Sequence, residues 1–372
     1  MTVQSGATEV ALVRRLWRPV VEELVPYDAG KPVESLMAEL GLSELVRLSA
    51  NENPLGPSAR VVEAIRREAE RVHLYPDGGG FAVRDALARR LGISPAQIVL
   101  GNGADELISL VARAVVDPGD EAVVPMPSFE PYSTSVTLAG GRVIPSPLAG
   151  YDTDLDDVRR RVTARTKAVI LCSPHNPAAT IIPGATLLRF LDALGADAPL
   201  VVLDEAYCDF VEEPDYPDGV KLLARYPRLL VLRTFSKVAA LAGLRVGYAV
   251  GSLEAADRIN RVREPYNVNR LGQAAALAAL EDVEHWERTK RVVREERAFL
   301  SRELSKRGVT FPPSHANFLL VKVDDADGLR QRLLEAGLAV RDGAAVGFPG
   351  HLRISIGTRE ANERLLRVLD GA

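Results

Sequence analysis

The sequence predicts an α/β fold in which a mainly parallel β-sheet is covered by helices on both faces. Short β-rich runs alternate with helical patterns through the middle of the chain, as expected when a crossover helix joins each strand to the next. Several of the runs are apolar throughout, which is typical of strands buried on both faces. After about residue 270 the alternation changes, and a separate, smaller unit is expected there.

The expected strands of the sheet follow one another at intervals that leave room for a helix. Each run stops at a polar or glycine-containing segment, which marks the end of the strand. The expected strands are Ile98–Leu100, Glu121–Val124, Ala168–Cys172, Leu200–Leu203, Leu229–Leu232 and Gly247–Val250.

The last hundred residues are expected to form a βαβ unit preceded by a long charged helix. That helix covers residues 283–307 and ends at Gly308, because glycine readily adopts the left-handed conformation that follows a helix. A strand at Asn317–Val323, a helix at Asp327–Ala336 and a strand at Arg353–Ile356 follow. The charges on the long helix are interpreted as a solvated face.

Composition argues against several classes of protein. The chain has 372 residues, 47% of them hydrophobic, and a formal net charge of −4, which leaves room for two domains and does not suit a nucleic-acid-binding surface. No apolar run reaches the length of a membrane span, and the first residues lack the pattern of a signal peptide. Cys172 and Cys208 are expected to be free thiols in a reducing compartment. We therefore expect a cytoplasmic protein.

Polar residues follow four of the expected strands. In open parallel sheets, ligands bind beyond the carboxyl ends of the strands, so these segments are candidates for one site. In chain order they are "GNGADEL", "SPHNPAAT", "DEAYCDF" and "RTFSK". They would bring together a glycine-rich turn, Asn176, Asp204, Tyr207, Thr234, Ser236 and Lys237.

Each of these segments has an ordinary structural explanation when it is taken alone. The glycines permit a tight turn into a helix whose first N–H groups, at Ala104 and Asp105, could hold a phosphate, but such a turn is common. The segment does not match the GxxxxGK[ST] pattern of a P-loop. Asp204 could cap a helix, Lys237 could be a surface lysine, and Arg245 could be the partner of an acid. The combination is more informative than any member.

Together the segments resemble the pyridoxal-phosphate-dependent aminotransferases of fold type I, and within them the histidinol-phosphate aminotransferases. The resemblance covers the chain from about Pro26 to Thr358. The matching segments are "LVPYDAGK", "SANENPLGPS", "YPDGGG", "LGNGADELI", "PSFEPY", "HNP", "LDEAY", "RTFSKVAALAGLRVGY", "PYNVN", "ANFLLV" and "VRD…LRISIGT".

The resemblance implies an α/β large domain with a mainly parallel seven-stranded sheet flanked by helices, and a smaller α+β C-terminal domain. It divides the chain into an N-terminal arm at residues 1–45, a large cofactor-binding domain at 46–270 and a small domain at 271–372. It also implies a homodimer with shared active sites, to which Tyr75 of "YPDGGG" would contribute by reaching the cofactor phosphate of the neighbouring subunit.

The resemblance assigns three catalytic residues and no metal. Lys237 would form the Schiff base with the aldehyde of the cofactor and later move the substrate proton. Asp204 would keep the pyridine nitrogen protonated, so that the ring withdraws electrons from the reacting carbon. Tyr207 and Asn176 would hydrogen-bond the phenolic oxygen of the ring. Phe129 of "PSFEPY" would stack on the ring, although an aromatic residue there could also be part of the core.

The cofactor phosphate would be held by backbone and side-chain donors from two segments. They are the N–H groups of Ala104 and Asp105, the hydroxyls of Thr234 and Ser236 and the guanidinium of Arg245. An arginine suits the apolar stretch around residue 245 because its planar fork can meet two phosphate oxygens at once.

Substrate recognition would involve a second group of residues. Arg353 matches the arginine that binds the anionic group of the substrate across the family, and Arg341 and Tyr27 complete the set that reads a substrate phosphate. Asn51 and Asn53 of "NENP" would shape the loop over the pocket. A solvated Arg341 and a purely structural turn at Asn51 and Asn53 remain open readings. The implied reaction is transamination between L-histidinol phosphate and 2-oxoglutarate, a step of histidine biosynthesis.

Two departures from the family pattern leave alternatives open. The usual Asn-Pro-Thr-Gly continuation is replaced by Asn176-Pro177-Ala178-Ala179, and Ala239-Ala240 replaces a bulkier residue and a glycine. Neither change removes a catalytic group. An aminotransferase for aromatic amino acids and a threonine-phosphate decarboxylase are the alternative functions. A non-catalytic regulator with the same fold is disfavoured because Lys237 is retained.

Overall fold

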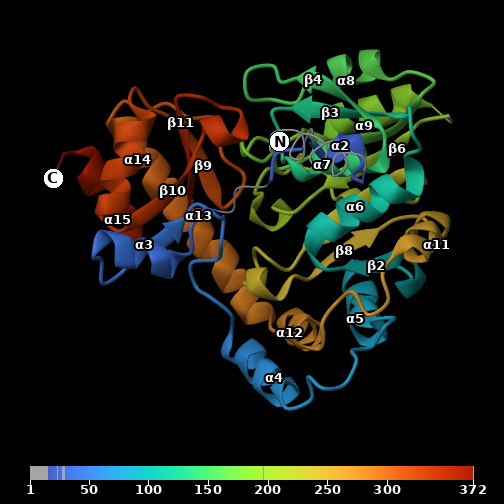
Figure 1. Cartoon of the computed structure of the whole chain (residues 1–372), viewed down its shortest axis with the longest axis horizontal. Coiled ribbons are helices and arrows are strands. Elements are labelled where there is room, and N and C mark those ends of the chain that lie inside the picture. Colours follow the sequence, from blue (N-terminus) through green and yellow to red (C-terminus); the bar gives the residue numbers. More distant parts are fainter. Residues whose placement is uncertain (1–15, 23, 27–29, 196, 372) are drawn as a thin grey trace, which may run out of the picture.

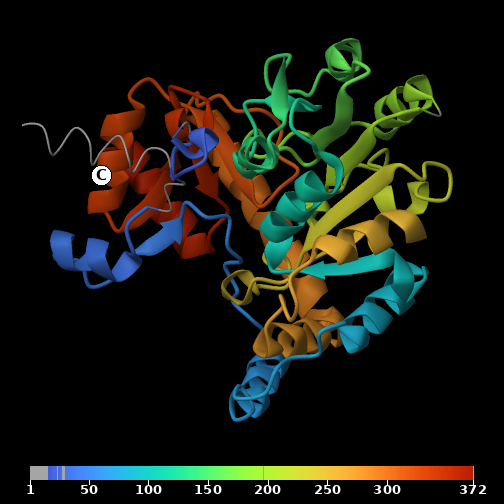
Figure 2. The same ribbon diagram turned by 45° about the vertical axis from the view of Figure 1, so that its right-hand side comes forward.

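The computed structural model describes residues 16–22, 24–26, 30–195 and 197–371, and the statements below refer to these residues. Figures 1 and 2 show two units, a larger one built mainly from the middle of the chain and a smaller one built mainly from its C-terminal part. The α/β class and the second unit expected from the sequence are confirmed.

The larger unit contains a seven-stranded sheet with the order β2-β8-β7-β6-β5-β3-β4. β8 runs antiparallel to both of its neighbours, and the other pairs are parallel. The carboxyl ends of β2, β3, β5, β6 and β7 therefore meet at one edge. The strands are β2 (Ile98–Gly101), β3 (Glu121–Met126), β4 (Arg142–Pro147), β5 (Thr166–Cys172), β6 (Leu200–Asp204), β7 (Leu229–Thr234) and β8 (Gly247–Val250).

Helices cover both faces of this sheet, which explains why its strands are apolar throughout. Along β6, for example, Val201 and Leu203 pack in one core and Val202 in the other. One face is covered by α6 (Gly103–Val115), α7 (Pro131–Ala139) and α11 (Leu253–Val262). The opposite face is covered mainly by α5 (Phe81–Leu91), α8 (Leu155–Arg161), α9 (Gly184–Leu194) and α12 (Arg270–Glu281), with α4 (Ala59–Ala69) packed on α12.

The smaller unit contains a four-stranded sheet with the order β1-β10-β11-β9. Its apolar face packs on helices in a separate core. Figure 1 shows the N-terminal strand β1 and helix α3 (Val33–Leu40) beside this C-terminal unit. The strands are β1 (Val46–Leu48), β9 (Phe318–Lys322), β10 (Leu338–Asp342) and β11 (His351–Ser355), and the helices are α14 (Ala326–Glu335) and α15 (Arg359–Leu369).

Two elements lie across the domain boundaries that the sequence suggests. β1, whose residues fall at the start of the expected large domain, pairs with β10 of the small sheet. α12 packs in the core of the large unit, and α13 (Val283–Lys306) reaches both cores, with Trp286 in one and Leu300 in the other. One continuous helix thus connects the two units along their length (Figure 1). The remaining helices, α2 (Pro19–Glu22) and α10 (Gly219–Leu222), are single turns.

The expected strands of the large sheet are all present, and the long helix is followed by Gly308 at φ 72° as expected. Three strands were missed. β4 contains two prolines and lies at the sheet edge, where the missing N–H of proline is tolerated. β1 has only three residues. β10 lies between the second helix and the last strand of the expected βαβ unit, so that β11 pairs antiparallel with both β10 and β9.

Cys172 and Cys208 are free thiols, as expected. Among the described residues, no helix is both long and apolar enough to cross a membrane. The same part of the chain holds no group of three or more His, Cys, Asp or Glu side chains arranged to bind a metal ion.

Candidate active site

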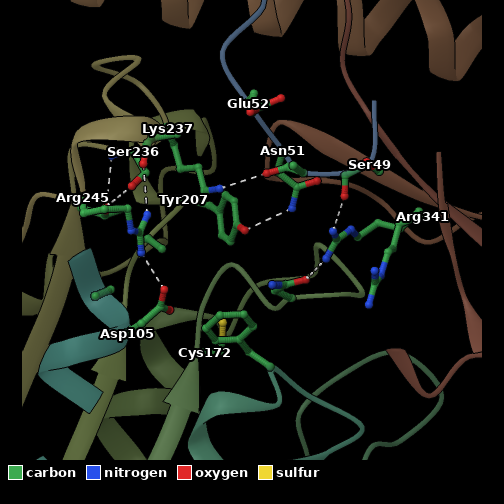
Figure 3. Close-up of a pocket in the computed structure, with 18 of the residues that line it drawn as sticks. Ser49, Asn51, Glu52, Asp105, Cys172, Tyr207, Ser236, Lys237, Arg245 and Arg341 are labelled. Atoms are coloured by element: carbon green, nitrogen blue, oxygen red, sulfur yellow. Dashed lines mark hydrogen bonds and ion pairs between the residues drawn. The ribbon is translucent and has the colours of Figure 1, made fainter. Parts of the chain in front are cut away.

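A cavity of about 280 Å³ lies where the carboxyl edge of the large sheet meets the small sheet. Figure 3 shows side chains from both units pointing into it. Most of the site residues expected from the sequence line this cavity, namely Ala104, Asp105, Phe129, Asn176, Tyr207, Thr234, Ser236, Lys237, Arg245, Arg341 and Arg353. Residues that were not assigned to the site also line it, among them Arg47, Ser49, Glu52, Tyr132 and Cys172. Asn51, which was expected to shape the loop over the pocket, lines it as well.

Asp204 lies at the end of β6, in the middle of the large sheet, and only 3% of its surface is exposed. The hydroxyl of Tyr132 donates to Asp204 Oδ2 at 2.7 Å, and the N–H of Ala206 donates to Oδ1 at 2.9 Å. Burial raises the pKa of Asp204 to about 6, although both hydrogen bonds act in the opposite direction. A cation placed against this carboxylate would offset its desolvation.

Tyr132 is a residue that the sequence analysis missed. It lies three positions after Phe129, inside the quoted "PSFEPY" segment, and is fully buried on α7. Its ring packs edge-on against the ring of Phe129, with 5.6 Å between centroids. Phe129 lies two residues before α7, and the Tyr132 N–H donates to its carbonyl oxygen at 3.2 Å, so both rings come from one short turn. The second aromatic residue of the quoted segment was the available signal.

Lys237 follows β7 and reaches into the cavity from the large unit. Its Nζ lies 3.3 Å from the carbonyl oxygen of Ala50 and 5.5 Å from the centroid of the Tyr207 ring. Burial, together with the positive charge of Arg353, lowers the pKa of Lys237 to about 8. A lysine with this pKa has a substantial neutral fraction near pH 8, and the neutral amine is the form that attacks a carbonyl.

Two polar chains connect the lysine side of the cavity to the small sheet. Asn51 donates from Nδ2 to the Tyr207 hydroxyl at 3.1 Å, and Ser355 of β11 donates to Asn51 Oδ1 at 3.2 Å. In parallel, Arg353 of β11 donates to Asn176 Oδ1 and to the Ser49 carbonyl, both at 2.7 Å. The residues expected to contact the cofactor ring, Tyr207 and Asn176, are thus both oriented by the small unit.

An anion-binding corner lies at the other end of the cavity. Arg245 pairs with Asp105 at 2.6 Å, and the hydroxyl of Thr234 donates to that of Ser236 at 2.9 Å. Gly103 has φ 78°, and a Cβ there would lie 2.5 Å from Arg245 Nη2, so only glycine lets the guanidinium lie against the start of α6. The Asn102 side chain does not cap the helix.

This donor set fits the phosphate of pyridoxal phosphate. The first N–H groups of α6 have no side-chain cap and carry the positive end of the helix dipole, which favours an anion. Two hydroxyls and a guanidinium line the same cavity, and all three are groups that bind phosphate. Lys237 and Asp204 then remain for the aldehyde and the ring nitrogen.

The small sheet presents its arginines to the cavity in a row. Arg341 of β10 and Arg353 of β11 are direct partners in the antiparallel ladder, so their side chains leave the same face of the sheet. The opposite face carries Leu338, Val340 and Leu352, which are buried in the small core. Both arginines line the cavity, and Figure 3 shows Arg341 at its right-hand side.

The two departures from the family pattern leave the local turns in place. Ala179 and Ala240, each near the position where the family pattern has glycine, have φ 64° and φ 59°. These are left-handed conformations that cost an alanine about 1 kcal/mol or more. The surrounding structure holds them, since Ala179 N–H donates to the His175 carbonyl at 2.7 Å and Ala179 is fully buried.

Three of the expected site residues that the structure describes do not line the cavity, namely Asp204, Asn53 and Tyr75. Asn53 lies behind the lysine and donates from Nδ2 to the carbonyl oxygens of Lys237 and Val238 at 3.2 and 3.0 Å, so it positions the segment that carries Lys237. Tyr75 is 78% exposed and stacks on Tyr266 at 4.6 Å, on the outer surface. Tyr27 lies outside the described residues.

Comparison with known proteins places the chain in a family. The family model for aminotransferase class I and II matches residues 43–369. A histidinol-phosphate aminotransferase of Moorella thermoacetica is 40% identical over 95% of this chain and 92% of that relative, and one of Anaeromyxobacter sp. is 42% identical over 94% and 97%. The crystal structure of histidinol-phosphate aminotransferase from Sinorhizobium meliloti in complex with pyridoxal-5'-phosphate has a TM-score of 0.87, at 29% identity over 96% of this chain and 98% of that one. The chain therefore belongs to the class I and II aminotransferases.

Proposed function

We propose that the protein is a pyridoxal-phosphate-dependent aminotransferase that acts on L-histidinol phosphate and 2-oxoglutarate in histidine biosynthesis. The observation that carries the substrate assignment is the pair Arg341 and Arg353, which face one cavity from directly opposite positions on adjacent strands. Like charges directly opposite each other in a sheet are destabilising, and a bound dianion offsets that cost. The substrate phosphate is such a dianion, whereas the α-carboxylate of an ordinary amino acid carries one negative charge.

The chain supplies proton transfer and orientation around the cofactor. Pyridoxal phosphate, when bound, supplies an electron-withdrawing ring that stabilises negative charge on the substrate carbon. Lys237 provides the attachment point for the cofactor aldehyde, and its amine then moves the proton at the substrate carbon. Asp204 holds the proton at the ring nitrogen, and Tyr132 orients Asp204 through the 2.7 Å hydrogen bond.

The remaining residues orient the cofactor relative to the substrate. Tyr207 and Asn176 would bind the phenolic oxygen of the ring, and Phe129 would pack against the ring. The phosphate would be held by the N–H groups of Ala104 and Asp105, by Thr234 and Ser236, and by Arg245. Because Asn176 Oδ1 accepts from Arg353 at 2.7 Å, a substrate anion that draws Arg353 away also changes the contact of Asn176 with the ring.

A half-reaction scan tests this function. Each amino donor is added alone to the enzyme loaded with pyridoxal phosphate, and the absorbance change shows whether the cofactor is converted to its amine form. L-Histidinol phosphate is expected to give the largest kcat/KM, ahead of phenylalanine and threonine phosphate. A higher value for phenylalanine would favour an aromatic aminotransferase, and loss of carbon dioxide from threonine phosphate would favour a decarboxylase.

We also propose that the active enzyme is a cytoplasmic homodimer with shared sites. Tyr75 and Tyr266 form an exposed aromatic pair, which suits a contact with a second copy, and Tyr75 would reach the partner's cofactor phosphate. Mixing inactive Tyr75→Ala and Lys237→Ala subunits should restore activity, because one site of each hybrid has both residues. Absence of recovery after verified subunit exchange would contradict shared sites.

A further inference from the structure

An ion pair at the cavity mouth has no role in the function proposed above. Arg47 of β1 donates from Nε to Glu52 Oε2 at 2.8 Å, and its Nη2 pairs with the other carboxylate oxygen. Both residues line the cavity. Figure 3 shows Glu52 on the same chain segment as Ser49 and Asn51, close to Lys237.

The strand register places Arg47 in the same row as the two substrate arginines. Arg47 is the ladder partner of Ala339 in the parallel pair formed by β1 and β10. Arg341 lies two residues after Ala339, so it leaves the same face of the sheet. Arg341 in turn is the partner of Arg353. Three neighbouring strands therefore each direct one arginine to the cavity, and Glu52 is the acid beside the outermost.

Glu52 has a fixed backbone and an adaptable side chain. Its carbonyl oxygen accepts from Asn317 Nδ2 at 3.4 Å, and the preceding residue, Asn51, donates its N–H to Ser355 Oγ at 2.8 Å. The side chains of Arg47 and Glu52 are 46% and 32% exposed. An ion pair this exposed contributes little to stability. Either side chain can therefore leave the pair and bind a ligand at a small cost in free energy.

An aminotransferase of the proposed kind must bind two substrates with different side arms in one cavity. The side arm is the part of the substrate that lies on the other side of the reacting carbon from the anion that both substrates share. The amino donor carries an imidazole, which offers N–H donors and titrates near neutral pH. The acceptor carries a second carboxylate in the same place. The imidazole requires an acceptor or an anion, and the carboxylate requires a cation. Arg341 and Arg353 bind the group that the two substrates share, an anion next to the reacting carbon, and so do not distinguish the arms.

We propose that Arg47 and Glu52 together bind the side arms of both substrates, an inference that rests on the proposed function. The Glu52 carboxylate accepts an N–H of the imidazole while its other oxygen keeps Arg47. When the acceptor binds, the Arg47 guanidinium turns its fork to the second carboxylate and releases Glu52. Arg47 therefore keeps a charged partner in both half-reactions, and the released Glu52 carboxylate, whose side chain is 32% exposed, is hydrated instead.

Opposite substitutions separate the two roles in the loaded enzyme. Arg47→Met should lower kcat/KM of the L-glutamate half-reaction about 10-fold or more, the size expected for a lost charged contact, and change the histidinol-phosphate half-reaction less than about 3-fold. Glu52→Gln should show the reverse split. Arg60→Met, which removes an exposed pair with Glu281 at 3.2 Å outside the cavity, is the matched control and should change neither.

Binding of glutarate, an unreactive dicarboxylate, provides a readout that does not depend on turnover. Its dissociation constant, measured by calorimetric titration, should rise about 10-fold in Arg47→Met and not in Glu52→Gln. If Arg47→Met fails to fold, Arg47→Lys tests the same point, because it keeps the charge and loses the fork; it should bind glutarate with intermediate affinity.

One result would overturn this inference alone, and another would overturn the proposed function. Equal losses in both half-reactions for both variants, with unchanged glutarate binding, would show that the pair is only structural and would overturn this inference. A wild type that reacts with L-glutamate but not with L-histidinol phosphate would overturn the proposed function, and with it the role of Glu52 toward an imidazole.

Discussion

The two walls of the cavity are built in different ways. The wall from the large unit consists of residues that follow strands and begin helices, such as Lys237 and the N-terminus of α6, and the buried Asp204 lies behind it. Burial displaces the pKa values of two charged groups on this side toward neutrality, to about 6 for Asp204 and about 8 for Lys237. The wall from the small unit consists of side chains in the middle of strands. It presents arginines from β10 and β11 on one sheet face.

The difference shows how two recognition problems are solved. The cofactor is a fixed ligand, so its contacts can lie in short segments whose geometry is local. The substrates change in each half-reaction, and the arginines proposed to bind their anionic groups are aligned by sheet register. In this proposal short segments determine the chemistry of the cofactor, and strand register determines which substrates bind. Substitutions on one side of the cavity at a time separate these two contributions.

The largest expected effect comes from the large-unit wall. Lys237→Ala should lower kcat by at least about 10⁴-fold, since the variant loses both the attachment point and the proton-transfer group. The measurement is transamination with L-histidinol phosphate, together with reduction by borohydride, which should no longer fix the cofactor to the chain. Lys221→Ala, at an exposed lysine of the same unit, should retain activity and labelling.

A substitution of Asp204 tests whether its buried carboxylate lowers the free energy of unfolding. Its pKa of about 6 in the folded protein lies above the ordinary 3.8, so the cofactor-free protein loses stability as pH rises through this window. Asp204→Asn should therefore be more stable than the wild type above pH 6, by up to about 3 kcal/mol, with the difference vanishing below about pH 4. Urea unfolding across pH measures this.

The control for Asp204 is Asp327→Asn at an exposed acid. That variant retains Asp204, so its unfolding free energy should follow that of the wild type across pH. A difference between Asp204→Asn and the wild type that stays constant from pH 4 to pH 8 would mean that burial does not displace the pKa of Asp204.

Arg341 tests the small-unit wall. Arg341→Ala should weaken catalysis with L-histidinol phosphate by about 2 kcal/mol, or roughly 30-fold in kcat/KM, because a charged contact to the phosphate is lost. The half-reaction with phenylalanine should change much less, and the absorbance of the loaded cofactor should not change. Arg330→Ala, on exposed α14, is the control. Equal losses for both donors would remove Arg341 from phosphate recognition.

The smallest expected effect concerns the turns that support the large-unit wall. Ala179→Gly should raise the free energy of unfolding by about 1 kcal/mol, because φ 64° is strained for alanine and not for glycine. Activity should remain close to that of the wild type. Ala86→Gly, inside α5, should instead lower stability by about 1 kcal/mol. A destabilising Ala179→Gly would indicate that packing around the buried methyl outweighs the strain.

Much of the large-unit wall could be predicted from single segments. The strands were visible as apolar runs, and the polar residues after them were expected to meet because the ends of parallel strands share one edge. Tyr132 was missed although its segment was quoted, since an aromatic residue in a helix gives no sign of the acid that it contacts across 72 positions. Asn53, for which a structural role was left open, holds the carbonyl oxygens of Lys237 and Val238.

The sequence by itself determined the fold class and the family resemblance, and it placed the lysine, the acid and the glycine-rich turn at strand ends, because each depends on neighbouring residues and on strands that follow in order. Only the tertiary structure decided that Arg47 stands in line with Arg341 and Arg353. That alignment requires β1, from the start of the chain, to pair with β10 near its end in one particular register. A shift of one residue would turn Arg47 to the opposite face, and no local pattern in the chain specifies that register.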